Sequence, residues 1–135
     1  MWEQRIRELA DAQGALQRGD MSGALAPYAP DVVLELAPGS GPDLAGTYHG
    51  HLGLMEAARP WMDQWNDYWV ENDQVTPIDE DRLLVLFRDG GRGRTSGAAV
   101  SRRLGAVLAY RANKIIHIRQ YDSQEEALDS VGLTE

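Results

Sequence analysis

Two residues of this sequence could donate or accept a proton in a cavity, and they lie far apart along the chain. Asp122 follows the last expected strand, and His51 stands at the start of an expected helix. A carboxylate or an imidazole that faces a substrate can act as a general acid or base. Asp122 also has a structural interpretation, because an acid beside a helix cap at Ser123 interacts favourably with the helix dipole. His51 could instead donate a hydrogen bond to a ligand from the rim of a pocket.

The spacing of the histidines argues against a metal site. His49 and His51 stand two residues apart, which can chelate a metal from a strand, but Gly50 and the following helix start disturb that geometry. His117 is distant in the sequence, and no carboxylate stands at a useful spacing nearby. The absence of cysteine excludes disulfides, thiol catalysis and thiolate metal ligands. We therefore expect no metal and no cofactor.

The charge balance and the hydropathy limit the classes of partner. A formal net charge of -8 argues against general nucleic-acid binding. No apolar run approaches the ~20 residues of a membrane-spanning helix, so we expect no membrane partner. The start of the sequence lacks a signal-peptide pattern, and we expect a cytoplasmic location.

Basic residues gather in the second half of the chain. Between Leu83 and Tyr121, arginines and one lysine stand against a single acid, Asp89. Two interpretations remain open: a solvated, arginine-rich back of a sheet that faces acidic helices or a second subunit, or a surface that attracts an anionic ligand. The segment Gly91-Arg92-Gly93-Arg94 lacks the lysine and the helix of a phosphate-binding loop, so we expect an exposed hairpin there.

Hydrophobic periodicity predicts the elements that must position these side chains. Apolar steps of three and four residues indicate a first helix from Trp2 to about Leu16, which Gly19 ends. The capping box Ser123-Gln124-Glu125-Glu126 opens a last short helix. The expected segments between them are a helix over Met21–Tyr28, a strand over Asp31–Leu36, a loop over Pro38–Pro42, an extended segment over Thr47–His49, a helix from Leu52 to Gln64, strands over Asp67–Val75 and Leu83–Arg88, a connection over Asp89–Arg94, and strands over Thr95–Tyr110 and Lys114–Tyr121.

The last two strands form the centre of the expected sheet. Alternation gives this pair one apolar face and one mixed face. Helices early in the chain and an antiparallel meander late describe an α+β domain, and the length of 135 residues indicates a single domain over residues 1–135. The apolar face carries Leu104, Ala106, Leu108, Tyr110, Ile116, Ile118 and Gln120, and the other face carries Val107, His117, Arg119 and Tyr121.

Several short segments occur in a characteristic order over nearly the whole chain. They are Leu16-Gln17-Arg18-Gly19-Asp20, Tyr28-Ala29-Pro30-Asp31-Val32-Val33, Gly46-Thr47-Tyr48-His49-Gly50-His51, Arg82-Leu83-Leu84-Val85-Leu86, Gly91-Arg92-Gly93-Arg94-Thr95-Ser96-Gly97, and Tyr121 with Glu126-Ala127-Leu128. In this order they resemble the SnoaL-like branch of the nuclear transport factor 2-like superfamily. The resemblance implies a cone-shaped barrel, in which a strongly curved antiparallel sheet wraps around N-terminal helices and leaves a pocket, and it implies a homodimer. The superfamily includes enzymes and binding proteins, so the fold alone does not define a function.

The resemblance also implies catalytic positions, and this sequence lacks the functional groups at them. In the ketosteroid isomerases of the superfamily, the general-base aspartate aligns with Leu36, the oxyanion-hole tyrosine with Ala12 and the protonated acid with Ala106. None of these side chains can move a proton or stabilise an oxyanion. We therefore expect no ketosteroid isomerase activity.

Two further activities of the superfamily differ in what they require. The epoxide hydrolases use two aspartates and an arginine, but Gln120 and the apolar segment Leu84–Leu86 stand at the corresponding positions. A polyketide cyclase needs one acid or base and a pocket that orients the substrate. This second possibility stays open, with Asp122 or His51 as the acid or base.

Aromatic residues indicate a ligand most clearly. Trp61 and Trp65 share the apolar face of the expected third helix, and they either line a pocket for a flat or cyclic molecule or pack in the core. We expect a ligand pocket among the residues on the apolar faces of these elements, with two residues at its mouth. These residues are Leu36, Trp61, Trp65, Ala106, Leu108, Tyr110, Ile118 and Gln120, with Tyr48 and His51 at the mouth.

Three functions remain open from the sequence. The first is a SnoaL-like protein whose apolar pocket binds a small hydrophobic or cyclic molecule without established catalysis. The second is a cyclase, isomerase or dehydratase that uses Asp122 or His51. The third is a non-catalytic interaction domain whose dimer is the functional unit and whose cavity is collapsed. Independently of these three, we expect a homodimer that forms through the face that carries His117, Arg119 and Tyr121.

Overall fold

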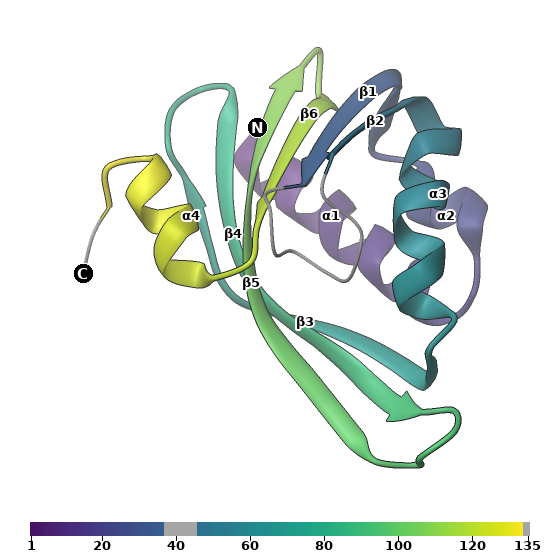
Figure 1. Cartoon of the computed structure of the whole chain (residues 1–135). Helices are drawn as coiled ribbons and strands as arrows, with labels where there is room; N and C mark the ends of the chain where they lie inside the picture. Colours follow the sequence, from purple (N-terminus) through teal and green to yellow (C-terminus); the bar gives the residue numbers. More distant parts are fainter. Residues whose placement is uncertain (37–45, 134–135) are drawn as a thin grey trace.

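The computed structural model describes residues 1–36 and 46–133, without the side chain of Trp61. The expected loop over Pro38–Pro42 lies outside these residues. The described chain folds into helices and a six-stranded sheet that curves around them (Figure 1), which confirms the α+β class. The elements in chain order are α1 (Trp2–Gln17), α2 (Met21–Leu25), β1 (Tyr28–Leu36), β2 (Gly46–His49), α3 (Gly50–Met62), β3 (Trp65–Pro77), β4 (Arg82–Gly93), β5 (Ala99–Arg111), β6 (Lys114–Tyr121) and α4 (Gln124–Ser130).

The sheet has the strand order β2-β1-β6-β5-β4-β3. Every pairing is antiparallel except that of β1 with β6, which is parallel. Parallel neighbours need a long crossover connection, and most of the chain lies between these two strands. β2 and β3 are the two edge strands, so the described sheet curves strongly but does not close into a barrel.

The main core lies between α1 and the concave face of the sheet. Leu9, Ala12 and Ala15 are the apolar residues that α1 buries, as the steps of three and four predict. The same cluster contains the buried, inward-facing residues of four strands and Ala57 of α3. They are Val32, Leu34, Leu36, Leu83, Val85, Ala106, Leu108, Tyr110, Ile115 and Ile118.

The convex face of the sheet is covered in part by α4, which Figure 1 shows on the side opposite the other helices. Ala127 and Leu128 of α4 pack on Leu84 and Leu86 of β4. At Gly105 the helix approaches so closely that a Cβ would collide with the Cβ of Ala127. The hydroxyl oxygen of Ser123 accepts a hydrogen bond of 3.1 Å from the backbone N–H of Glu126, which confirms the predicted cap.

The segment Asp89–Arg94 differs from its sequence prediction. It was expected to connect two strands, but β4 continues through Gly93, and the connection follows after it. The glycines explain the difference, because the adjacent strands β3 and β5 pass very close to them. A Cβ at Gly90 would strike the carbonyl of Val100, and one at Gly91 would stand 2.8 Å from the Cβ of Trp65. These glycines therefore permit strand contact, where the sequence suggested a turn.

Arg5 ties the start of α1 to two turns of the sheet. Its guanidinium lies between the rings of Trp2 and Tyr110, 4.7 and 4.8 Å from the two ring centroids. It donates hydrogen bonds to the side chain of Asn113 at 3.0 Å and to the carbonyl of Glu80 at 2.9 Å. Only 6% of Arg5 is exposed, so water screens these interactions little.

We predict that Arg5→Ala lowers the free energy of unfolding by about 3 kcal/mol, because it removes two cation–π contacts and two charge-assisted hydrogen bonds. Urea unfolding measures the change. Arg7→Ala is the matched control, since Arg7 is exposed on the same helix, and it should cost no more than about 0.5 kcal/mol. Equal losses in the two variants would contradict the role of Arg5.

Candidate ligand-binding cavity

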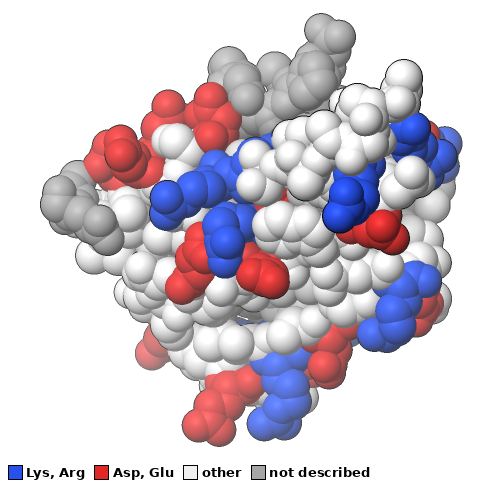
Figure 2. All heavy atoms as spheres, turned by 90° about the horizontal axis from the view of Figure 1, so that it is seen from below, with Lys and Arg blue, Asp and Glu red and all other residues white. Residues whose placement is uncertain are grey.

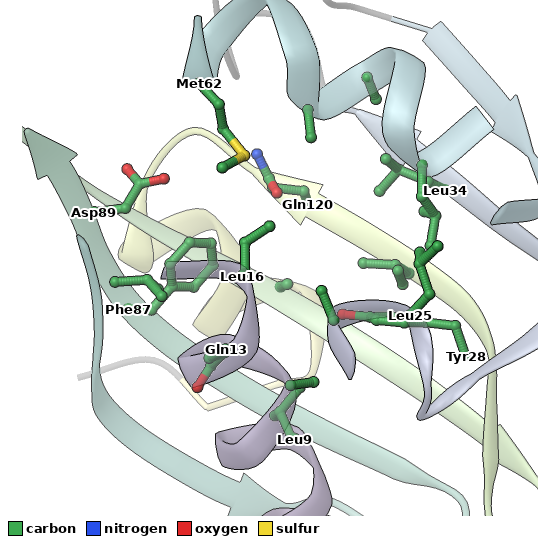
Figure 3. Close-up of a pocket in the computed structure, with 18 of the residues that line it drawn as sticks. Leu9, Gln13, Leu16, Leu25, Tyr28, Leu34, Met62, Phe87, Asp89 and Gln120 are labelled. Carbon is green, nitrogen blue, oxygen red and sulfur yellow. The ribbon is translucent and has the colours of Figure 1, made fainter. Parts of the chain in front are cut away.

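A cavity of about 240 Å³ lies between the helices α1, α2 and α3 and the concave face of the sheet. Figure 3 shows its walls, with Leu9 of α1 on one side and Met62 of α3 on the other. Most of the lining is apolar. The apolar lining residues are Leu9, Ala12, Leu16, Met21, Ala24, Leu25, Leu34, Leu36, Leu54, Met55, Ala57, Ala58, Met62, Val70, Val85, Phe87, Ala106, Leu108 and Ile118.

Local sequence explains why these side chains face the cavity. On β4 the alternate residues Val85, Phe87 and Asp89 line it, and on β5 Ala106 and Leu108 do so, as the two-residue period of a strand requires. Small side chains at facing positions leave the space open. They are Ala12 on α1, Ala24 on α2, Ala57 and Ala58 on α3, and Ala106 on β5.

One wall carries a hydrogen-bonded cluster of Tyr68, Asp89 and Arg102. Arg102 donates from Nε to Oδ1 of Asp89 at 2.8 Å and from a terminal nitrogen to Oδ2 at 3.3 Å. The Tyr68 hydroxyl donates to Oδ2 at 2.9 Å. Burial, and then the Asp89 charge, raise the pKa of Tyr68, so its hydroxyl stays protonated at neutral pH. The buried carboxylate is thus neutralised by Arg102 and fully engaged with its neighbours.

Tyr28 approaches the cavity from the start of β1 and carries its second hydroxyl. In Figure 3 its ring lies across the cavity wall opposite Asp89, with the oxygen directed inward. Burial raises the pKa of Tyr28 to about 12, so the hydroxyl is neutral at physiological pH. The backbone carbonyl of Tyr28 lies 2.9 Å from Nε2 of His51 and accepts its hydrogen bond, so His51 holds this residue in place.

The two amides of the cavity wall are partnered. Gln13 of α1 exchanges two hydrogen bonds with Asn72 of β3, of 3.0 and 2.9 Å. Gln17, one turn further along α1, accepts from the backbone N–H of Val70 at 3.0 Å. Gln120 of β6 is also engaged in an interaction. The hydrogen bonds of Gln13 and Gln17 attach α1 to β3 and set the width of the cavity between them.

The structure brings part of the expected pocket together. Leu36, Ala106, Leu108, Ile118 and Gln120 line the cavity. The other expected residues lie elsewhere, and the side chain of Trp61 is outside the described residues. His51 contacts the Tyr28 carbonyl, Tyr110 packs edge-on against Trp2, Tyr48 packs at the edge of the main core, and Trp65 lies against Gly91.

Trp65 differs because the third helix is shorter than predicted. The helix ends at Met62, and β3 begins at Trp65. The expected helical face therefore does not extend to this residue. Tyr110 does share the buried face of Ala106 and Leu108, but it stands at the end of the strand, where Trp2 and Arg5 cover it.

The two candidate proton-transfer residues do not line the cavity. Asp122 stands beside α4, where its proximity raises the pKa of Glu126, and its Oδ1 is buried without a hydrogen-bond partner among the described residues. His51 uses Nε2 for the Tyr28 carbonyl. Within residues 1–36 and 46–133, no group of three or more His, Asp or Glu side chains is arranged to hold a metal ion.

Sequence reasoning missed Tyr28, Asp89 and Arg102 as cavity residues. A signal was available in the strand alternation, because Asp89 lies an even number of residues from Val85 on β4 and is therefore expected on the same face. Arg102 likewise lies an even number of residues from Ala106 on β5. Asp89 is also the single acid of its long basic stretch, and its position opposite Arg102 in the strand register accounts for its burial.

Several arginines of the basic stretch are paired with acids of the same chain. Arg88 contacts Glu71 and Asp73, and Arg119 contacts Glu35. Figure 2 shows positive and negative side chains interspersed over the face seen from below. This arrangement agrees with a solvated sheet surface, and such exposed pairs add little stability. No helix among the described residues is long and apolar enough to cross a membrane.

The curved sheet, the helices in its concave face and the cavity between them define a nuclear transport factor 2-like fold. The SnoaL-like domain model matches residues 6–118, and the chain belongs to this family. No curated protein matches the sequence significantly.

Solved structures of low sequence identity share the fold. A nuclear transport factor 2-like protein of unknown function from Burkholderia pseudomallei superposes with a TM-score of 0.74 at 20% identity, over 95% of this chain and 97% of that one. TerC, crystallised with polyporic acid, gives 0.75 at 17% identity, over 94% and 97%. RV0760c from Mycobacterium tuberculosis, in complex with estradiol-17beta-hemisuccinate, gives 0.68 at 19% identity, over 86% and 91%.

We predict that the protein loses stability above pH 10. An unfolded tyrosine ionises near pH 10.0, whereas burial raises the pKa of Tyr28 to about 12 and also raises those of Tyr68 and Tyr110. The stability contributed by the neutral hydroxyls is complete below pH 10. It falls as the pH rises further, by about 1.4 kcal/mol per pH unit for each such tyrosine.

Urea unfolding between about pH 8 and pH 11 measures this loss. Tyr28→Phe removes one of the three groups and should make the decline with pH shallower. Tyr121→Phe is the control on the convex side of the sheet, where Tyr121 packs with the α4 cluster, and should leave the slope unchanged. A slope that is identical in wild type and Tyr28→Phe would contradict the burial of this hydroxyl.

Proposed function

We propose that this protein binds a small, mainly apolar cyclic molecule in the cavity between its helices and the concave face of the sheet. The observation that carries the proposal is the cavity itself, about 240 Å³ in volume and lined chiefly by Leu, Met, Ala and Val side chains. A pocket with apolar walls and a few placed polar groups is the usual form of a small-molecule site. An apolar ligand would gain roughly 25 cal/mol for each Å² that it removes from water.

The cavity volume limits the size of the ligand. It lies just below the ~300–1,000 Å³ typical of ligand pockets, so it suits a molecule of one or two rings. The methionines Met21, Met55 and Met62 in the wall can adapt their shape to such a ligand. Two proteins of the same fold were crystallised with ring compounds, polyporic acid and estradiol-17beta-hemisuccinate, and this supports a ring compound as the class of ligand.

The chemistry of the cavity supports binding over acid–base catalysis. Ala12, Leu36 and Ala106, which align with the catalytic groups of ketosteroid isomerases, all line the cavity, and none of them can transfer a proton. Of the titratable groups in the wall, Asp89 is paired with Arg102, and the tyrosines are held neutral. An efficient general base needs a pKa near the working pH and access to the substrate. The alternative of a cyclase, isomerase or dehydratase that uses Asp122 or His51 is not favoured, because neither residue is among those that line the cavity.

We also propose a homodimer, which rests on the family and on the convex face of β6. Glu35, His117 and Arg119 form a polar group there, with Glu35 3.5 Å from His117 and 3.2 Å from Arg119. The Arg119 guanidinium lies 5.6 Å from the ring centroid of Tyr121. This half-exposed surface beside α4 offers a second chain both charged and aromatic contacts.

We predict that filling the cavity weakens ligand binding. Wild-type protein should bind the hydrocarbon tetralin, and Ala106→Phe should weaken this binding by about 10-fold or more, because the larger ring occupies the cavity. Isothermal titration calorimetry measures both affinities. Ala109→Phe is the matched control, since Ala109 is on the same strand and alternation directs it to the opposite face.

The thermal transition of each variant shows that it remains folded. If Ala106→Phe does not fold, Ala58→Phe fills the cavity from a half-buried position on α3. Equal tetralin affinity in wild type and a folded, cavity-filling variant would rule out this cavity as the binding site.

We predict that sedimentation equilibrium at micromolar concentration gives about twice the chain mass of 14.9 kDa. Arg119→Glu should shift the equilibrium toward monomer, because it places a second carboxylate beside Glu35. Arg18→Glu, at the exposed end of α1, should not. A monomer at every accessible concentration would overturn the homodimer.

A further inference from the structure

The hydroxyl of Tyr28 gives the cavity a chemical preference. We infer that Tyr28 is a specificity-determining residue that donates a hydrogen bond to the ligand, and that the ligand is an uncharged ring compound carrying a hydrogen-bond acceptor. This inference rests on the proposed binding function of the same cavity. It adds that the Tyr28 hydroxyl is the protein group that recognises the ligand, and that the ligand is uncharged.

The position of Tyr28 is well determined by its neighbours. It pairs with Ile115 at the start of the parallel β1–β6 ladder, and its ring packs against the main core. The backbone N–H of Ile115 donates to the carbonyl of Pro27 at 2.9 Å, and His51 contacts the Tyr28 carbonyl. These contacts hold the backbone of Tyr28 on both sides, and Figure 3 shows the oxygen of its side chain pointing toward the centre of the cavity.

The Tyr28 hydroxyl has no hydrogen-bond partner within residues 1–36 and 46–133, and this distinguishes it from the other polar groups of the wall. Tyr68 donates to Asp89, Gln13 is paired with Asn72, and Gln120 is also engaged. A ligand that fills the cavity removes water from this hydroxyl, and a hydroxyl left unpaired there costs free energy unless a ligand atom accepts its hydrogen bond. The neutral phenol is the stronger partner as a donor, because the ring withdraws electron density from its oxygen. An acceptor atom of the ligand therefore suits it best.

The charges of the wall select against a charged ligand. Asp89 and Arg102 are the charged groups among the lining residues, and they neutralise each other at 2.8 Å. A carboxylate or an ammonium group in the cavity would face no unbalanced opposite charge there. Its loss of hydration would remain uncompensated, so an uncharged compound binds more favourably.

The experiment compares ring compounds of one size and different chemistry. Tetralin offers no acceptor, α-tetralone and β-tetralone add a carbonyl at two positions, and β-naphthoate adds a charge. Calorimetric titration of each into wild type, Tyr28→Phe and the control Tyr121→Phe gives the affinities. We expect Tyr28→Phe to weaken at least one tetralone by about fivefold to tenfold, the worth of one hydrogen bond, and to leave tetralin unchanged or tighter. Tyr121→Phe should change none of them.

A measurement on the wild-type protein alone provides a second test, which does not depend on the folding of a variant. The infrared carbonyl stretch of bound tetralone should lie at lower frequency than in cyclohexane, because a hydrogen bond weakens the C=O bond. A frequency equal to that in cyclohexane would overturn the hydrogen bond from Tyr28.

The remaining outcomes separate the two proposals. If tetralin and the tetralones bind but Tyr28→Phe weakens them equally or not at all, the role of Tyr28 is wrong and the binding function stands. If β-naphthoate binds most tightly, the preference for an uncharged ligand is wrong. If wild type binds none of these compounds, the binding function itself is wrong, and this inference falls with it.

Discussion

The arrangement of α1 against the concave sheet is the constraint on which the rest of the structure depends. Burial of Leu9, Ala12 and Ala15 attaches the helix to the sheet, while Arg5 at its start and Gln13 and Gln17 near its end connect it to the surrounding turns and to β3. Because Ala12, Ala106 and the alanines of α3 line the interior with small side chains, the elements meet without filling the space between them. Protein interiors are normally close-packed, so an apolar space of this size between firmly attached elements indicates a site for a ligand.

The polar groups of the cavity wall differ in their roles: Asp89 and Arg102 neutralise each other, and Tyr28 offers a neutral hydroxyl. Asp89 and Arg102 are neighbours across β4 and β5, and their pairing lets a carboxylate be buried without unbalanced charge. A buried ion pair contributes little net stability, and its presence in the wall is more easily understood as shaping the electrostatics of the cavity. Tyr28 lies on the other side of the cavity with a neutral hydroxyl. The interior therefore offers a ligand apolar contact and directed hydrogen bonding, but no net charge.

Much of the fold could be predicted from the sequence, and the site only in part. Backbone geometry sets the periods of helices and strands, and burial selects the apolar face, so α1 and the face of β5 appear directly in the pattern of apolar residues. The expected face of β6 was wrong at Ile116, because a register shift between Ala109 and Tyr110 buries Ile115 in its place. Leu36 and Ala106 could be placed in the cavity because they stand on those faces. Trp65 could not, because its position depends on where α3 ends, and Tyr110 could not, because the curvature of the sheet brings its end of β5 against Trp2 and Arg5. The glycines of β4 were misread for a related reason: close strand contact and tight turns require the same residue.

The central claim is that the space between α1, α3 and the sheet binds an apolar molecule, and methyl NMR of the methionines tests it most directly. The chain has four methionines, of which Met21, Met55 and Met62 line the cavity, while Met1 is 65% exposed at the start of the chain. Titration with tetralin should shift the methyl signals of Met21, Met55 and Met62 with one common dissociation constant and leave Met1 in place. If those three signals do not move at saturating tetralin, or if Met1 moves with them, the cavity is not the binding site.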